Sequence, residues 1–251
     1  TVVLSDASDP ANTVTQTTTV SSGTWSITAD LSTLEDGTVS ITADVDDQAG
    51  NSATTATKDL TLDTVAPSIA ADALTVTTVD SSDSSKSANL KQGDKIVLTI
   101  DLGEAASGLN NLPSSNDSTV INVNATGVES VWSTTGNYLK LTYTVASGVN
   151  GAITIDESAL NTLLSDAGIT DDAGNSASIA TFNALTDPSN SVDTVAPTIA
   201  IAGTLESDNI INASEVGYVV VSGTSNAEDG QTVTVVLSDA SDPANTVTQT
   251  T

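Results

Sequence analysis

The side chains with the clearest chemical potential in this chain are carboxylates that gather around short linker segments. Asp63 opens one linker, and Asp171 and Asp172 lie in an Asp-x-Ala-Gly-Asn turn that we expect beside it. Glu35 and Asp36 come from a Leu-Glu-Asp-Gly loop that we expect on the other side of the same linker. Converging acids repel one another unless a cation shares them, and oxygen ligands without His or Cys select Ca²⁺ over Zn²⁺ or copper. These five residues are therefore a candidate Ca²⁺ site.

The segments that must position these acids repeat along the chain. Residues 1–18 (TVVLSDASDPANTVTQTT) return letter for letter as residues 234–251, so position 1 is equivalent to position 234 and the period is 233 residues. Within that period, the Asp-Thr-Val-Ala-Pro segment at residues 63–67 returns at residues 193–197, which is 130 residues later, and leaves 103 residues for the rest. Exact repetition indicates a protein that gains length by stacking units.

The two repeats divide the chain into three parts. We expect residues 1–62 to be the C-terminal part of one module and residues 63–192 to be a complete module. Residues 193–251 are then the N-terminal part of a module of the same type as residues 1–62. Two incomplete modules leave open sheet edges, which pair readily with other strands. We therefore expect the ends to continue in a longer array or to be completed by a neighbouring identical chain.

A second set of acids follows from the repeat. Asp193 opens the next linker, where it would meet Asp46 and Asp47 of the following copy, and Glu206 and Asp208 would supply the junction after that. Each aspartate taken singly also suits a tight turn, because Asp and Asn bond to the backbone and Gly accepts positive φ. The turn is the simpler interpretation of any one residue, whereas the whole set favours Ca²⁺.

Alternating apolar and polar residues predict an all-β fold of tandem Ig-like β-sandwiches. Residues 156–168 differ, because apolar residues there follow a helical spacing between Asp156 as N-cap and Gly168 as stop. We expect one short helix there, in the larger module. Across the repeat boundary, the expected strands of the shorter module are residues 197–201, 218–223, 232–238, 13–20, 24–29, 38–45 and 53–62. The aromatic residues expected in the core are Trp25, Trp132, Tyr138, Tyr143 and Tyr218.

Composition excludes several classes of function. Five basic residues against 32 acidic ones give a net charge of −27, which repels nucleic acid and anionic membranes. The absence of Cys and His removes disulfides, thiolate metal sites and the commonest general base. No apolar run is long enough to cross a bilayer. We expect no enzyme activity, no small-molecule substrate, no nucleic-acid partner and no membrane insertion.

The Asp-Thr-Val-Ala-Pro boundary, the Asp-x-Ala-Gly-Asn turn, residues 208–215 (DNIINASE) and the acidic, Cys-free composition together resemble bacterial Ig-like tandem repeats of giant type I-secreted, RTX-type adhesins. The resemblance implies an extracellular stalk on the bacterial surface, as in biofilm adhesins, made rigid by Ca²⁺ at the linkers. The ligands it implies are Asp63, Asp171 and Asp172, with Asp193, Asp46 and Asp47. The alternation of two module sizes departs from uniform arrays.

Three functions remain open from the sequence. The first is a structural extender repeat stiffened by Ca²⁺, whose partners are adjacent repeats of the same array. The second is a self-assembling filament or surface-layer subunit, in which half-modules interlock between chains. The third, a carbohydrate-binding module, requires an exposed aromatic face that the strand patterns do not provide.

Overall fold

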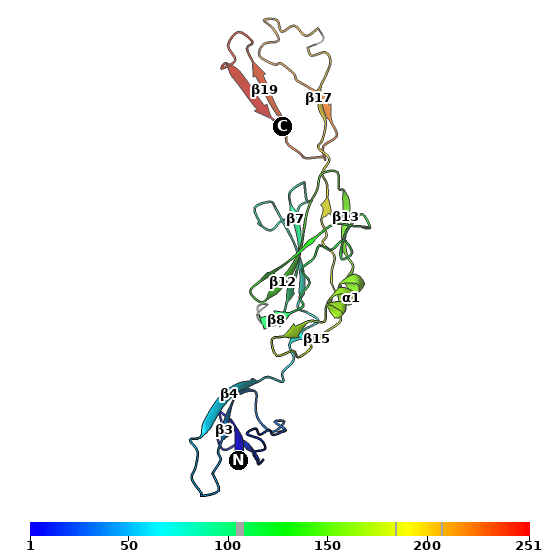
Figure 1. Cartoon of the computed structure of the whole chain (residues 1–251). Coiled ribbons are helices and arrows are strands. Elements are labelled where there is room, and N and C mark those ends of the chain that lie inside the picture. The colour runs from blue at the N-terminus through cyan, green and yellow to red at the C-terminus, as the bar shows by residue number, and fades with distance from the viewer. Residues whose placement is uncertain (104–107, 184, 207) are drawn as a thin grey trace. The chain divides into compact units, whose positions relative to one another are not determined.

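The computed structural model describes residues 1–103, 108–183, 185–206 and 208–251. The fold is all-β with one short helix, as the sequence pattern predicts. The chain divides into two compact units, Thr1–Asp193 (unit 1) and Thr194–Thr251 (unit 2), which are described separately (Figure 1). Unit 1 contains two separate hydrophobic cores, one within residues 1–62 and one within residues 63–193.

Residues 1–62 form a four-stranded antiparallel sheet in the order β2-β1-β3-β4. Alternation along the strands turns Val2, Leu4 and Val39 to one face, where they are buried together with Leu34. The order corresponds to one sheet of an Ig-like sandwich, built from four of the expected strands. The strand bounds are β1 Val2–Asp6, β2 Thr13–Gln16, β3 Gly37–Ala43 and β4 Ala56–Leu62.

The prediction of a strand at residues 24–29 is wrong, because only an isolated bridge from Ser21 to Thr24 forms in this region. In a seven-strand sandwich, this strand pairs in the sheet that lies opposite, and residues 1–62 do not contain that sheet. Ile27 still packs against the small core. Trp25, expected in the core, is 51% exposed.

Residues 63–193 form a β-sandwich of two four-stranded sheets. One sheet has the order β11-β12-β7-β6 and the facing sheet has the order β10-β9-β13-β16. Two small pairs close the ends, β14 with β8 in antiparallel fashion and β15 with β5 in parallel. The first sheet comprises β6 Leu74–Val79, β7 Lys95–Asp101, β11 Val131–Thr135 and β12 Tyr138–Thr144. The second comprises β9 Ile121–Val123, β10 Thr126–Gly127, β13 Gly151–Ile155 and β16 Ser191–Val192. The small pairs comprise β5 Ser68–Ile69, β8 Leu109–Asn110, β14 Thr170–Asp171 and β15 Ser178–Ile179.

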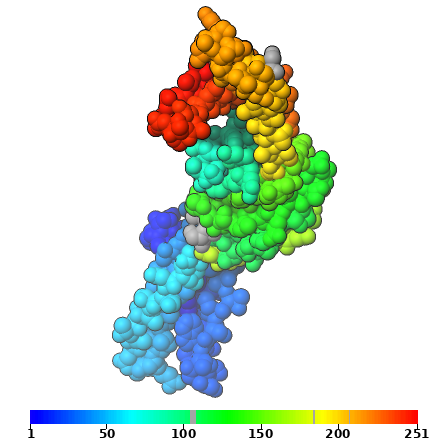
Figure 2. Space-filling model, turned by 90° about the horizontal axis from the view of Figure 1, so that it is seen from above, coloured from blue at the N-terminus to red at the C-terminus, as the bar shows by residue number. Residues whose placement is uncertain are grey.

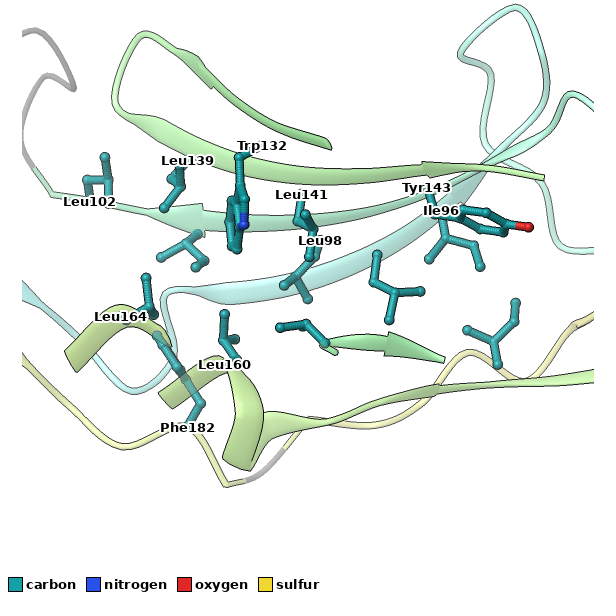
Figure 3. Packing of buried hydrophobic residues seen from close by; sticks show 14 of the residues in the cluster. Ile96, Leu98, Leu102, Trp132, Leu139, Leu141, Tyr143, Leu160, Leu164 and Phe182 are labelled. Carbon is teal, nitrogen blue, oxygen red and sulfur yellow. The ribbon is translucent and has the colours of Figure 1, made fainter. Parts of the chain in front are cut away.

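The core of this module lies between the first sheet and a second layer that includes the helix (Figure 3). Leu98 and Leu141 come from neighbouring strands and are fully buried. Leu160 and Leu164 project from the helix into the same core. Of the aromatic residues predicted here, Trp132 and Tyr143 are buried, but Tyr138 is 44% exposed at the first position of β12.

The helix α1 (Glu157–Ala167) has the bounds that the sequence predicts. The carboxylate of Asp156 accepts a hydrogen bond from the backbone N–H of Ala159, which is the usual N-cap arrangement. Gly168 adopts the left-handed conformation that ends the helix, with φ +64°.

Unit 2 consists of two separate strand pairs, β17 with β18 and β19 with β20. A cleft of about 740 Å³ lies between the pairs and is lined by apolar residues such as Ile199, Ile201 and Val235 (Figure 2). None of the described residues of unit 2 is a buried hydrophobic residue, and Tyr218, expected in the core, is 87% exposed. The second expected strand, at residues 218–223, forms only from Gly223 onward. The bounds are β17 Ile199–Ile201, β18 Gly223–Ser225, β19 Thr234–Ser238 and β20 Thr246–Thr250.

Candidate functional site

The candidate site is the junction at the first linker, where two modules bind one peptide group. The N–H of Thr64 donates to Asp36 Oδ2 at 3.0 Å, and the Thr64 hydroxyl donates to Asp36 Oδ1 at 2.9 Å. The carbonyl of Asp63 accepts from Asn175 Nδ2 at 3.1 Å. The C=O and N–H of a trans peptide unit point in opposite directions. The peptide between Asp63 and Thr64 is therefore bound from the preceding module on one side and from its own module on the other.

Asn175 reaches Asp63 because the Asp-x-Ala-Gly-Asn turn holds it in place. Asp171 is 4% exposed, and its Oδ1 accepts from the Asn175 backbone at 2.8 Å while its Oδ2 accepts from Asn175 Nδ2 at 2.9 Å. Gly174 supplies the positive φ, +95°, that this turn requires. The side-chain hydrogen bond from Asn175 is the main cause that lowers the pKa of Asp171. Asp171 is thus an ionised turn residue.

Asp172 is the second residue of this turn and has a different hydrogen-bond partner. Asn110 donates to Asp172 Oδ1 at 3.2 Å and to the Asp171 carbonyl at 3.0 Å. The antiparallel pairing of β8 with β14 brings Asn110 opposite Thr170 and so places its amide at the turn.

The turn at Asp47 has the same internal geometry. Asp47 Oδ1 accepts from the backbone of Ala49 at 2.9 Å and of Asn51 at 2.8 Å, and Oδ2 accepts from Asn51 Nδ2 at 2.8 Å. Hydrogen bonds from Asn51 lower the pKa of Asp47. Asp46, the residue before it, forms an isolated bridge with Ser52. Both copies of the motif therefore form the turn that the sequence predicts for each aspartate singly.

A buried aspartate that sequence reasoning did not single out lies at the end of β1. Asp6 is 3% exposed, and its Oδ1 accepts from the Ser8 backbone at 2.7 Å and from the Ser8 hydroxyl at 2.6 Å. The pKa of Asp6 is lowered chiefly by Ser8 and also by the backbone amide of Glu35.

The remaining predicted ligands make hydrogen bonds away from the first linker. The backbone N–H of Asp193 donates to the Leu90 carbonyl at 2.8 Å. In unit 2, Glu206 accepts from the backbone N–H of Val220, and Asp208 Oδ1 accepts from that of Ile210 at 2.9 Å.

The junction contains the kinds of oxygen atom that bind Ca²⁺, but these atoms do not form a complete set of ligands. Carboxylates, carbonyls and side-chain amides are the oxygen ligands that Ca²⁺ takes. In the part of the chain that the structure describes, no three acidic residues lie together closely enough to hold a metal ion. Hydrogen bonds through Thr64, Asn175 and Asn110 instead connect four of the predicted ligands, Asp36, Asp63, Asp171 and Asp172. The fifth, Glu35, is exposed. Ca²⁺ at this junction stays a prediction.

Two of those three connecting residues carried a signal in the sequence. Thr64 belongs to the repeated Asp-Thr-Val-Ala-Pro segment, and Asn175 closes the repeated Asp-x-Ala-Gly-Asn turn. Repetition of a residue at both linkers indicates a role in the linker, although it does not say which atom is bound. Asn110 has no such signal, because its position depends on the pairing of two distant strands.

Comparison with known proteins agrees with the fold of the N-terminal part. No curated protein and no solved structure matches the chain. Within the described residues, no helix combines the length and hydropathy that a membrane span requires. Residues 1–64 match the family model of the bacterial Ig-like domain, a stretch that contains β1 to β4 and ends at the doubly bound peptide group.

Proposed function

We propose that this chain is a structural extender repeat of a bacterial cell-surface adhesin of the RTX type, with Ca²⁺ at the linkers between its modules. The observation that carries the proposal is the peptide group between Asp63 and Thr64, which is bound on opposite faces by Asp36 and Asn175. A spacer needs such a joint, because a linker fixed on both sides transmits the direction of one module to the next. The match of residues 1–64 to the bacterial Ig-like domain supports this role.

Charge explains how Ca²⁺ would act at the joint. A chain of net charge −27 repels itself, and the repulsion is greatest where acids of two modules approach each other. Asp36 and Asp63 lie on the two sides of the same linker, and ionised carboxylates retain lone pairs after accepting one hydrogen bond. A bound cation would draw these acids together and add to the hydrogen bonds of Thr64. The same reasoning extends to Asp193 at the second linker.

The test uses the full chain and measures binding and shape together. Isothermal titration with CaCl₂ should give saturable binding, and small-angle scattering should show a longer, less variable particle in Ca²⁺ than in EGTA. Asp36→Asn should weaken the binding while keeping an acceptor for Thr64. Asp166→Asn, on the exposed side of α1, makes the same change of charge away from the linker and should leave binding unchanged.

A second pair of measurements separates the cation from the hydrogen bonds. Thr64→Val removes the hydroxyl donor to Asp36 but no carboxylate, so it should loosen the particle in EGTA and leave Ca²⁺ binding in place. Absence of any heat signal, with scattering curves identical in Ca²⁺ and EGTA, would remove Ca²⁺ from the proposal and leave the hydrogen-bonded joint alone.

A further inference from the structure

Of the aromatic residues predicted in the core of residues 63–193, Tyr138 is the one that the structure places on the surface. It is 44% exposed at the first position of β12, whereas the next residue, Leu139, is fully buried and points into the core (Figure 3). Side chains alternate along a strand, so Tyr138 projects from the outer face of the sheet. The structure thus provides the exposed aromatic ring that the strand patterns did not indicate.

The neighbouring strands place polar side chains beside this ring. Asp101 lies directly opposite Tyr138 in the antiparallel pairing of β7 with β12. Thr99 is two residues before Asp101 and therefore on the same face of β7, and Thr75 of β6 lies opposite Thr99. The strand register therefore gathers one aromatic ring, one carboxylate and two hydroxyl groups at one end of the outer face.

These four side chains line a cleft of about 550 Å³, together with Ser68 and Asp72 from the segment that leads into β6. The turn before β6 forms one wall of the cleft. In this turn the N–H of Ala73 donates to the Ala70 carbonyl at 3.2 Å, and the Ala73 carbonyl accepts from the N–H of Asp101 at 2.9 Å. The volume falls within the range of about 300–1,000 Å³ that is usual for small-molecule sites.

The carboxylate of Asp101 is held in place at the cleft by the backbone. Its Oδ1 accepts from the N–H of Gly103 at 2.9 Å. Gly103 has φ +67°, and a Cβ added there would lie 3.2 Å from the Ser68 carbonyl, so this close approach requires glycine. A carboxylate accepts hydrogen bonds through both oxygens, so the bond from Gly103 leaves Asp101 able to accept from a ligand.

The chemistry of the lining fits a sugar ring without negative charge. Asp72 and Asp101 line the cleft, and none of the described residues that line it is basic, so acidic sugars and phosphates are repelled. The hydroxyl groups of Ser68, Thr75 and Thr99 can both donate and accept hydrogen bonds, as sugar hydroxyls do. An ammonium ion, which only donates, would use the carboxylates but would leave the hydroxyl donors without an acceptor.

We propose that this cleft binds one uncharged pyranose ring of a glycan. The ring packs its C–H groups against the face of Tyr138, and its hydroxyl groups donate to Asp72 and Asp101. This binding goes beyond the spacer role and is independent of Ca²⁺, because none of these residues belongs to the predicted Ca²⁺ site. A spacer that repeats the cleft offers one weak glycan contact in each repeat, and several such contacts bind together more tightly than one.

Saturation-transfer NMR on the full chain in EGTA tests the cleft with the methyl glycosides of glucose, galactose and mannose. At least one should receive saturation at its ring C–H protons, and methyl glucuronide, the acidic counterpart, should receive less. Tyr138→Ala should weaken the binding roughly tenfold, whereas Tyr138→Phe should keep it because packing needs the ring alone. Tyr218→Ala removes another exposed tyrosine, one that does not line the cleft, and should change nothing.

A second pair of variants tests the carboxylate. Asp101→Asn keeps an acceptor for Gly103 but removes the charge, so it should weaken glycoside binding, and Asp166→Asn should not. Loss of transfer in Tyr138→Ala and Asp101→Asn, with both controls unchanged and all circular dichroism spectra alike, supports the proposal. It is overturned by transfer that Tyr138→Ala leaves intact, by stronger transfer to the glucuronide, or by no transfer to any neutral glycoside. Because EGTA is present throughout, failure of the Ca²⁺ proposal would leave these results unchanged.

Discussion

At the scale of single residues, Asp171 and Asp47 make the same turn in different surroundings. Each accepts hydrogen bonds from the backbone and side chain of the Asn four positions later, and each has a lowered pKa for that reason. Asp171 is buried and its Asn also holds the linker, whereas Asp47 is exposed. Comparing variants at these two residues therefore separates the contribution of the linker contact from the contribution of the turn.

Replacing Asp171 by Asn should destabilise the chain at pH 7 and flatten its response to acid. The folded-state pKa lies below the ordinary value of 3.8, so the stabilisation by this carboxylate is complete above that pH and is lost as the pH falls through the folded pKa. The number of protons taken up on unfolding sets the slope of the unfolding free energy against pH. Without the carboxylate, that number should fall by up to about one proton. Urea unfolding between pH 7 and pH 2 measures this slope.

Asp47→Asn is the matched control for that experiment. It removes an equivalent turn carboxylate at an exposed site, at the end of the β3–β4 pair that lies away from the linker, so its effect on stability should be smaller. Equal losses in the two variants would mean that the turn alone matters and that the contact from Asn175 to the linker adds nothing.

The sequence predicted the local part of the site and not its connections. The turn at Asp171 depends on residues within five positions of one another, so spacing is enough to predict it. The contacts of Asp36 with Thr64 and of Asn110 with Asp172 join residues 28 and 62 positions apart. Such contacts depend on how strands pair, and no spacing rule encodes that.

At the scale of elements, α1 shows what local signals can determine. Its N-cap Asp156 and its final Gly168 are chemical signals that act within one turn, and the structure places both where the sequence predicts them. The strand at residues 24–29 shows the opposite case. Its alternation is clear, but a strand needs a neighbour to pair with, and the neighbour is absent from residues 1–62.

Removing the N-cap should weaken the helix by a measurable amount. Asp156→Ala leaves the N–H of Ala159 without its acceptor and should lower the free energy of unfolding by about 1 kcal/mol. The control is Asp166→Ala, which removes a carboxylate from the last turn of the same helix. An acid there opposes the helix dipole, so this variant should be neutral or slightly stabilised. Chemical denaturation of both variants is the measurement, and equal losses would assign the effect to charge alone.

At the scale of the whole molecule, burial is distributed unevenly. The module at residues 63–193 contains most of the buried apolar residues, residues 1–62 contain a few, and the described part of unit 2 contains none. Local stability follows buried apolar contact, so the three parts should open at different rates.

Limited proteolysis of dilute chain should reflect this order. Thermolysin, which cuts beside apolar residues, should remove unit 2 first and leave a fragment that ends near residue 193, with the module at residues 63–193 surviving longest. Mass spectrometry of the products identifies the cuts. First cleavage within β7 or β12 would contradict the order.

The parallel pairing of β5 with β15 has a mechanical consequence for a chain held at both ends. β5 follows the first linker, and β15 leads through β16 to the second. Once β16 has separated from β13, a pull applied at Asp63 and Asp193 draws β5 and β15 in opposite directions along their length. The hydrogen bonds between them are then loaded in shear and share the tension, whereas strands peeled from one end break their bonds one after another. A tether made of such modules resists stretching at the point where each module begins.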